Sequence, residues 1–93
     1  ELKDNNLHTV VLTATSDGGM YVGWRFRGGG KGVKVADRST VVKKSVYGPL
    51  PVAQFGVQLF SSATYGTCTL SVDGVVVSTK TVRGEHNVVV CVG

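Results

Sequence analysis

Two segments in the last third of the chain, Cys68-Thr-Leu-Ser-Val-Asp-Gly-Val-Val-Val77 and Val88-Val-Val-Cys91, decide the fold that the sequence predicts. An alternating run leads to Asp73-Gly74 and β-branched residues follow, a pattern typical of a β-hairpin with a type I′ turn. The period of two places Cys68 and Cys91 on inward faces. We therefore predict a disulfide, worth about 3 kcal/mol through restriction of the unfolded chain. Two buried free thiols are the alternative.

Length and composition predict a single β domain. The chain has 93 residues and is rich in valine and glycine, which favours strands over helices. We expect one domain over residues 7–93 and a disordered polar leader or linker remnant over residues 1–6. No apolar run is long enough to span a bilayer and the start does not resemble a signal peptide, so we expect any export or anchoring segment to lie outside this sequence. A disulfide would indicate an oxidising compartment.

Short alternating runs separated by glycine or proline indicate an all-β fold with about seven strands. A proline-containing break is expected at 48–51, a glycine loop at 28–32, and turns at 17–19 and 37–39. Regular spacing without any helical period predicts a two-sheet β-sandwich or a small barrel. Strands are expected at 7–16, 20–27, 33–36, 40–47, 52–60, on both sides of Asp73-Gly74, and at 88–92.

Positive charge is concentrated in one region of a chain whose formal net charge is +4. Seven basic residues between Arg25 and Lys44 are opposed by Asp37 alone. One interpretation is protection of exposed strand edges. The other is a surface for a polyanion such as phospholipid headgroups, cell-wall phosphates or nucleic acid, although Trp24 faces away and cannot stack on bases. The candidate polyanion-binding residues are Arg25, Arg27, Lys31, Lys34, Lys43 and Lys44.

No motif indicates catalysis, a cofactor or a metal. The Gly28–Gly32 loop contains Lys31, but Val33 follows it and no helix is expected, so it does not match a nucleotide-binding P-loop. His8 and His86 are isolated and are interpreted as surface residues, not metal ligands. The sequence therefore predicts a non-catalytic module that binds or positions something.

The second half of the chain resembles the soluble domain of the mycobacterial small membrane proteins called MmpS, which accompany the MmpL lipid and siderophore exporters. The resemblance is carried by Val46-Tyr-Gly-Pro-Leu-Pro51, by Gly66-Thr-Cys-Thr-Leu-Ser-Val-Asp-Gly-Val-Val76 and by Val88-Val-Val-Cys91. Where the family has a tryptophan after the second proline, this chain has Val52.

The resemblance implies an immunoglobulin-like sandwich, a Cys68–Cys91 bridge, and a location on the periplasmic side of the inner membrane, anchored through a segment absent from this sequence. It also implies an accessory role in which the partner is a membrane transporter of the MmpL type. The alternative that we draw from the charge distribution is a freestanding polyanion-binding module of a secreted, phage-borne or surface lipoprotein.

Overall fold

The computed structural model describes residues 7–93, and this part of the chain contains strands and turns but no helix. No element among these residues is a helix capable of crossing a membrane. The leader predicted at residues 1–6 lies outside the described residues. The six strands are β1 (Leu7–Phe26), β2 (Lys31–Tyr47), β3 (Ala53–Leu59), β4 (Tyr65–Val72), β5 (Val75–Arg83) and β6 (Val88–Val92).

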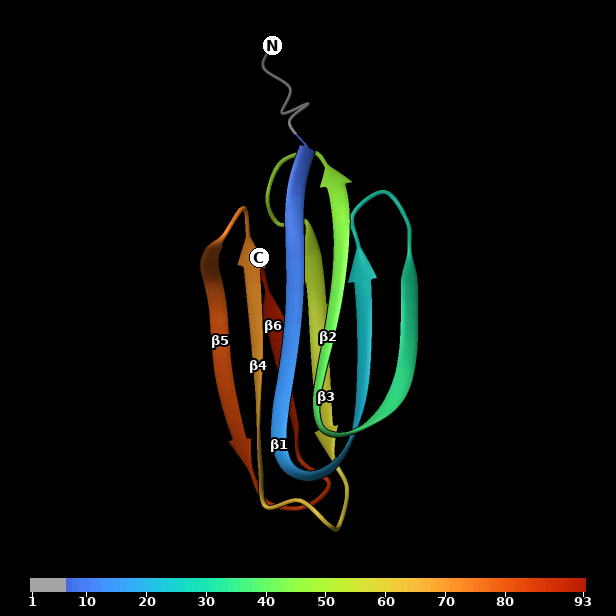
Figure 1. The fold of residues 1–93 in the computed structure, drawn as a ribbon, viewed down its shortest axis with the longest axis vertical. Coiled ribbons are helices and arrows are strands. Elements are labelled where there is room, and N and C mark those ends of the chain that lie inside the picture. Colours follow the sequence, from blue (N-terminus) through green and yellow to red (C-terminus); the bar gives the residue numbers. More distant parts are fainter. Residues whose placement is uncertain (1–6) are drawn as a thin grey trace.

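Strands β1 and β2 form one long antiparallel ribbon that bends back on itself. Their pairing runs from Leu7↔Tyr47 to Arg25↔Lys31, with a register shift between Thr15 and Gly19. In Figure 1, β1 descends, curves at the lower end and returns upward, and β2 follows it. The turns predicted at 17–19 and 37–39 are therefore bends within two strands, not boundaries between four. The prediction of about seven strands is corrected to six, because both strands curve together and remain paired.

The bend brings the two halves of β1 to different partners. Residues 10–16 of β1 pair with β4, whereas residues 20–26 pair with β3. The strand order is β5-β4-β1-β3-β6, with β2 paired to β1. The result is one six-stranded sheet folded over on itself and nearly barrel-shaped, rather than two clearly separate sheets. The all-β prediction is confirmed, and the immunoglobulin-like character stays a prediction.

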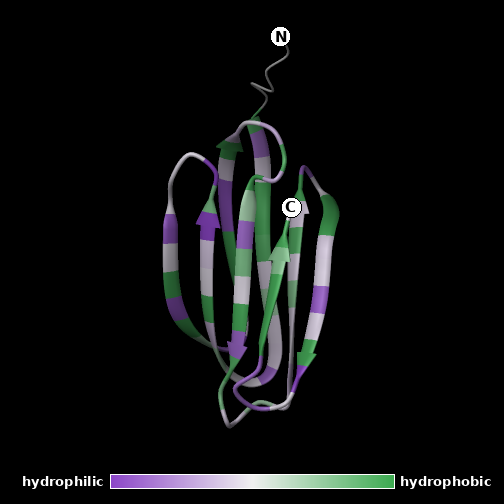
Figure 2. Cartoon of the chain, turned by 180° about the vertical axis from the view of Figure 1, so that it is seen from behind, coloured by the Kyte–Doolittle hydropathy of each residue, from purple (hydrophilic) through white to green (hydrophobic). Residues whose placement is uncertain are grey.

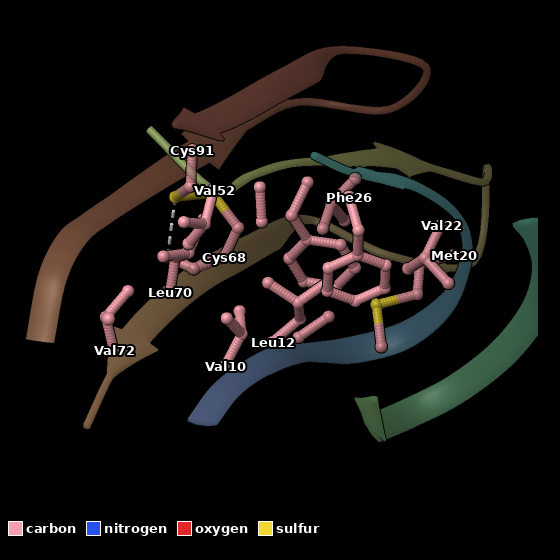
Figure 3. Close-up of a cluster of buried hydrophobic side chains, with 14 of the residues drawn as sticks. Val10, Leu12, Met20, Val22, Phe26, Val52, Cys68, Leu70, Val72 and Cys91 are labelled. Carbon is pink, nitrogen blue, oxygen red and sulfur yellow. Dashed lines mark hydrogen bonds between the residues drawn. A yellow bond between two sulfur atoms is a disulfide. The ribbon is translucent and has the colours of Figure 1, made fainter. Parts of the chain in front are cut away.

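The core fills the inside of the folded sheet, as the alternation of the strands predicts. Hydrophobic and hydrophilic bands alternate along the strands in Figure 2. Trp24 is only partly buried, and a Cβ atom at Gly32 would lie 2.6 Å from its ring, so the indole covers the backbone of β2. The fully buried apolar side chains include Val10, Leu12, Ala14, Met20, Val22, Phe55, Val57, Leu59 and Leu70 (Figure 3).

The Cys68–Cys91 disulfide is confirmed, and it crosses the interior (Figure 3). The two Cα atoms are 6.2 Å apart and both residues are fully buried. Their strands are not hydrogen-bonded neighbours, because β4 pairs with β1 and β5 whereas β6 pairs with β3. The predicted hairpin is also confirmed: Asp73 and Gly74 have φ values of 53° and 82°, as a type I′ turn requires. The bridge therefore joins the two halves of the folded sheet.

A tight contact holds the bend of β1 against the loop between β3 and β4. The Thr64 amide donates to Asp17 Oδ1 at 2.8 Å, and the Thr64 hydroxyl donates to Asp17 Oδ2. A Cβ atom at Gly18 would lie 2.2 Å from the carbonyl oxygen of Ser62, closer than real atoms approach. The bend therefore requires a residue without a side chain at position 18.

Replacing Gly18 with alanine should destabilise the fold, because the backbone of the bend or of the Ser62 loop must shift. We expect the free energy of unfolding in urea to fall by roughly 1–3 kcal/mol, the usual cost of overpacking. Gly23→Ala is the matched control, because its Cβ atom would lie 3.4 Å from the Val33 side chain and 3.8 Å from the Gly32 carbonyl oxygen, which are ordinary contacts. Equal stability of the two variants would contradict this account of the bend.

Candidate functional site

Four of the predicted basic residues gather at one end of the molecule, which we call the basic end: Arg25, Arg27, Lys31 and Lys44, around the loop Gly28–Gly30. Arg25 and Lys31 are register partners where β1 ends and β2 begins. Lys44 reaches this place from the far half of β2. Its Nζ lies 5.7 Å from the centroid of the Phe26 ring, and a Cβ atom at Gly30 would lie 2.7 Å from that Nζ. The bend of the ribbon thus brings Lys44 to the glycine loop.

Arg27 connects the glycine loop to the turn at 48–51. Its Nε donates to the carbonyl oxygen of Pro51 at 3.1 Å, and its backbone amide donates to the carbonyl of Val52 at 2.8 Å. A Cβ atom at Gly48 would lie 2.8 Å from Arg27 Cδ, so the side chain runs along the turn. Both loops lie at the upper end of the molecule in Figure 1. Arg27 therefore makes the two loops one continuous surface.

Two open hollows flank Arg27. One, of about 400 Å³, is lined by Arg27, Gly28–Gly30, Lys44, Ser45, Val46 and Tyr47. The other, of about 380 Å³, is lined by Arg25–Gly28, Pro51–Gln54 and Val92. Both hollows combine guanidinium or ammonium groups with apolar walls. They therefore suit a ligand in which an anionic group is attached to an apolar group.

The other two predicted residues do not join this cluster. Lys34 is the register partner of buried Val22, and Lys43 is the register partner of Val11, in the opposite half of β2. Within residues 7–93, β2 pairs with β1 alone and is therefore an edge strand. These two exposed lysines fit the edge-protecting interpretation. The structure therefore does not bring Lys34 and Lys43 together with the other four candidate residues.

The basic end has little opposing negative charge. Between Gly18 and Val72 the only acidic residue is Asp37, at the bend. None of the four cations forms an ion pair with another residue of the described range 7–93. Their charges are therefore available to an anionic partner.

Asp73 and His8 form a hydrogen-bonded pair at the same end. His8 Nδ1 lies 2.6 Å from Asp73 Oδ2, and the Thr9 amide donates to Asp73 Oδ1 at 2.9 Å. The hydrogen bonds from His8 and Thr9 lower the pKa of Asp73. The histidine side chain is 14% exposed, so it lies half-buried at the surface and is held there by Asp73. No local pattern predicts the pair, because 65 positions separate its members.

Residues that follow two of the segments carrying the family resemblance meet beside the basic end. The Val52 amide donates to the carbonyl of Gly93 at 2.6 Å, and the Gly93 amide donates to the carbonyl of Ala53 at 3.1 Å. The end of the chain therefore adjoins the residues that follow Pro51. Within residues 7–93, no three His, Cys, Asp or Glu side chains come together as metal ligands would.

Comparisons of the chain with protein-family models, with curated proteins and with solved structures found no match.

Stability should fall as the pH drops below about 4, because two carboxylates are hydrogen-bonded only in the folded state. Hydrogen bonds from Thr64 lower the pKa of Asp17, as those from His8 and Thr9 lower that of Asp73. The unfolded chain then binds protons at a higher pH than the folded chain, so the contribution is present above the ordinary value of 3.8 and is lost as the pH falls through the lowered values.

The measurement is the midpoint of urea unfolding as a function of pH. In Asp17→Asn and in Asp73→Asn, the urea midpoint should fall less steeply as the pH drops below about 4 than it does in the unmodified chain. Asp37→Asn is the control, because that carboxylate makes no hydrogen bond to other residues of 7–93. An equally steep fall in both variants would contradict the assignment.

Proposed function

We propose that this chain is a non-catalytic extracytoplasmic accessory domain that supports a lipid or siderophore exporter of the MmpL type by binding the transporter. Two observations support the proposal. The disulfide fits an oxidising compartment outside the cytosol. The disulfide also joins two of the segments that resemble MmpS proteins, and Val52, which follows the third, is hydrogen-bonded to Gly93. In this proposal, the folded sheet is an immunoglobulin-like sandwich.

The contact surface in this proposal is the basic end. The hollow between Arg25–Gly28, Pro51–Gln54 and Val92 combines the proline turn, the last strand and the guanidinium groups of Arg25 and Arg27. In this hollow a resembling segment and the cationic residues share a surface, and this observation carries the proposal. A non-catalytic role here needs only complementary shape and charge.

Co-purification tests the proposal. Tagged full-length protein extracted from its native membranes in mild detergent should recover a large membrane transporter. The double variant Arg25→Glu/Arg27→Glu should lose this partner, because it reverses the charge of the hollow. Lys43→Glu should retain it, since Lys43 is outside the basic end. Recovery of no transporter, or equal recovery with all variants, would count against the proposal.

A second candidate function is favoured by the charge of the same end. Four cations without ion-pair partners among residues 7–93 surround a glycine loop. This arrangement supports a freestanding module of a secreted, phage-borne or surface lipoprotein that binds a polyanion, such as anionic lipid or cell-wall phosphate. Nucleic acid fits less well in this proposal, because Trp24 packs against Gly32 and so has less of its ring available for base stacking.

The salt dependence of binding tests the second function. If all four cations contact phosphates, affinity for inorganic polyphosphate should fall by roughly two orders of magnitude between about 50 and 200 mM salt. Arg27→Gln/Lys44→Gln should weaken binding and reduce the slope, and Lys34→Gln/Lys43→Gln should leave both nearly unchanged. Binding that is undetectable or insensitive to salt would exclude this function.

A further inference from the structure

Two exposed apolar side chains border the basic end. Tyr47, the last residue of β2, is 66% exposed, and Leu50, in the turn that follows, is 51% exposed. Single exposed apolar residues on a protein surface need no explanation. These two are different because they lie in and next to a turn that directly contacts Arg27.

The contacts of Arg27 and Lys44 place positive charge on both sides of this turn. Tyr47 lines the same hollow as Lys44 and Arg27. Arg27 runs along Gly48 and donates to the carbonyl of Pro51. Leu50 therefore projects from a turn whose base is held by a guanidinium group.

The backbone of this turn is suited to entering an apolar boundary. Leu50 stands between Pro49 and Pro51, the only two prolines of the chain, and neither has an amide donor that would need a partner. Amphipathic aromatic rings such as that of Tyr47 are favoured at the level of lipid headgroups. Lysine and arginine are attracted to the negative surface of anionic membranes.

Taken together, these features fit a bilayer better than a dissolved polyanion. A dissolved polyanion would be held by the cations alone and would leave Leu50 in water. An anionic membrane offers phosphate groups to the cations and acyl chains to Leu50, because the two lie next to each other at its surface. Among residues 7–93, the acid at this end is Asp73, whose carboxylate is hydrogen-bonded to His8 and to the Thr9 amide.

We propose that the basic end docks on an anionic lipid bilayer, with Leu50 and Tyr47 entering the headgroup boundary and Arg25, Arg27, Lys31 and Lys44 contacting the phosphates. The inference rests on the second proposed function, polyanion binding, and names its ligand as a lipid surface.

Vesicle co-sedimentation of the purified chain tests the inference. The chain should bind vesicles of phosphatidylcholine containing about one-third phosphatidylglycerol, and should bind pure phosphatidylcholine vesicles much less, as electrostatic attraction to the surface requires. Leu50→Ser should weaken binding to the anionic vesicles by about tenfold, the effect expected when one leucine side chain no longer leaves water. Val41→Ser is the matched control, because Val41 is 48% exposed on β2 but lies outside the basic end.

Binding to inorganic polyphosphate separates the inference from the function on which it rests. Leu50→Ser should leave polyphosphate binding unchanged, whereas Arg27→Gln/Lys44→Gln should weaken binding to both ligands. If polyphosphate binds but anionic vesicles do not, or if Leu50→Ser binds vesicles like the unmodified chain, membrane docking is overturned and polyanion binding stands. If neither ligand binds, both are overturned. Tighter binding to an oligonucleotide than to vesicles would likewise overturn membrane docking.

Discussion

The bend in the β1/β2 ribbon is the constraint on which the rest of the structure depends. Because β1 stays paired with β2 through the bend, its two halves can hold β4 and β3 in one continuous sheet that encloses its own core. The bend is possible because Gly18 allows the Ser62 carbonyl to approach and Asp17 accepts hydrogen bonds from Thr64. A straight ribbon would leave the apolar faces of both halves in water.

The disulfide closes the side of the folded sheet that the bend in β1 and β2 leaves open. Strands β4 and β6 lie at or near the two ends of the strand order and share no backbone hydrogen bonds, so only side chains hold those parts of the sheet together. A covalent bond between Cys68 and Cys91 closes this side, and the bend closes the other. In a domain this small, with a limited core, one cross-link is a large share of the net stability. The two closures together position the loops at the end where Arg27 meets the turn at 48–51.

The local features of the fold could be predicted from the sequence, and the long-range ones could not. Alternation predicted the strands, and Asp73-Gly74 predicted a hairpin turn, because a period of two and a positive φ are properties of short segments. Turn residues at 17–19 marked a change of direction but could not reveal that pairing continues through it. The approach of Lys44 to Gly30 depends on the bend, so no local pattern could have identified the basic end.

The two interpretations of the basic region turn out to apply to different residues. Neighbouring residues on a strand point to opposite faces, so Lys43 and Lys44 cannot both extend to the glycine loop from β2. Lys44 extends over Phe26 to the glycine loop, whereas Lys43 stays on an exposed edge strand. Edge protection requires only that a charge be solvated, which both lysines satisfy. A shared anionic ligand requires charges that converge, and of the six candidate residues only Arg25, Arg27, Lys31 and Lys44 surround one loop. Convergence in space, not density in the sequence, therefore separates a candidate binding surface from a solvated strand edge.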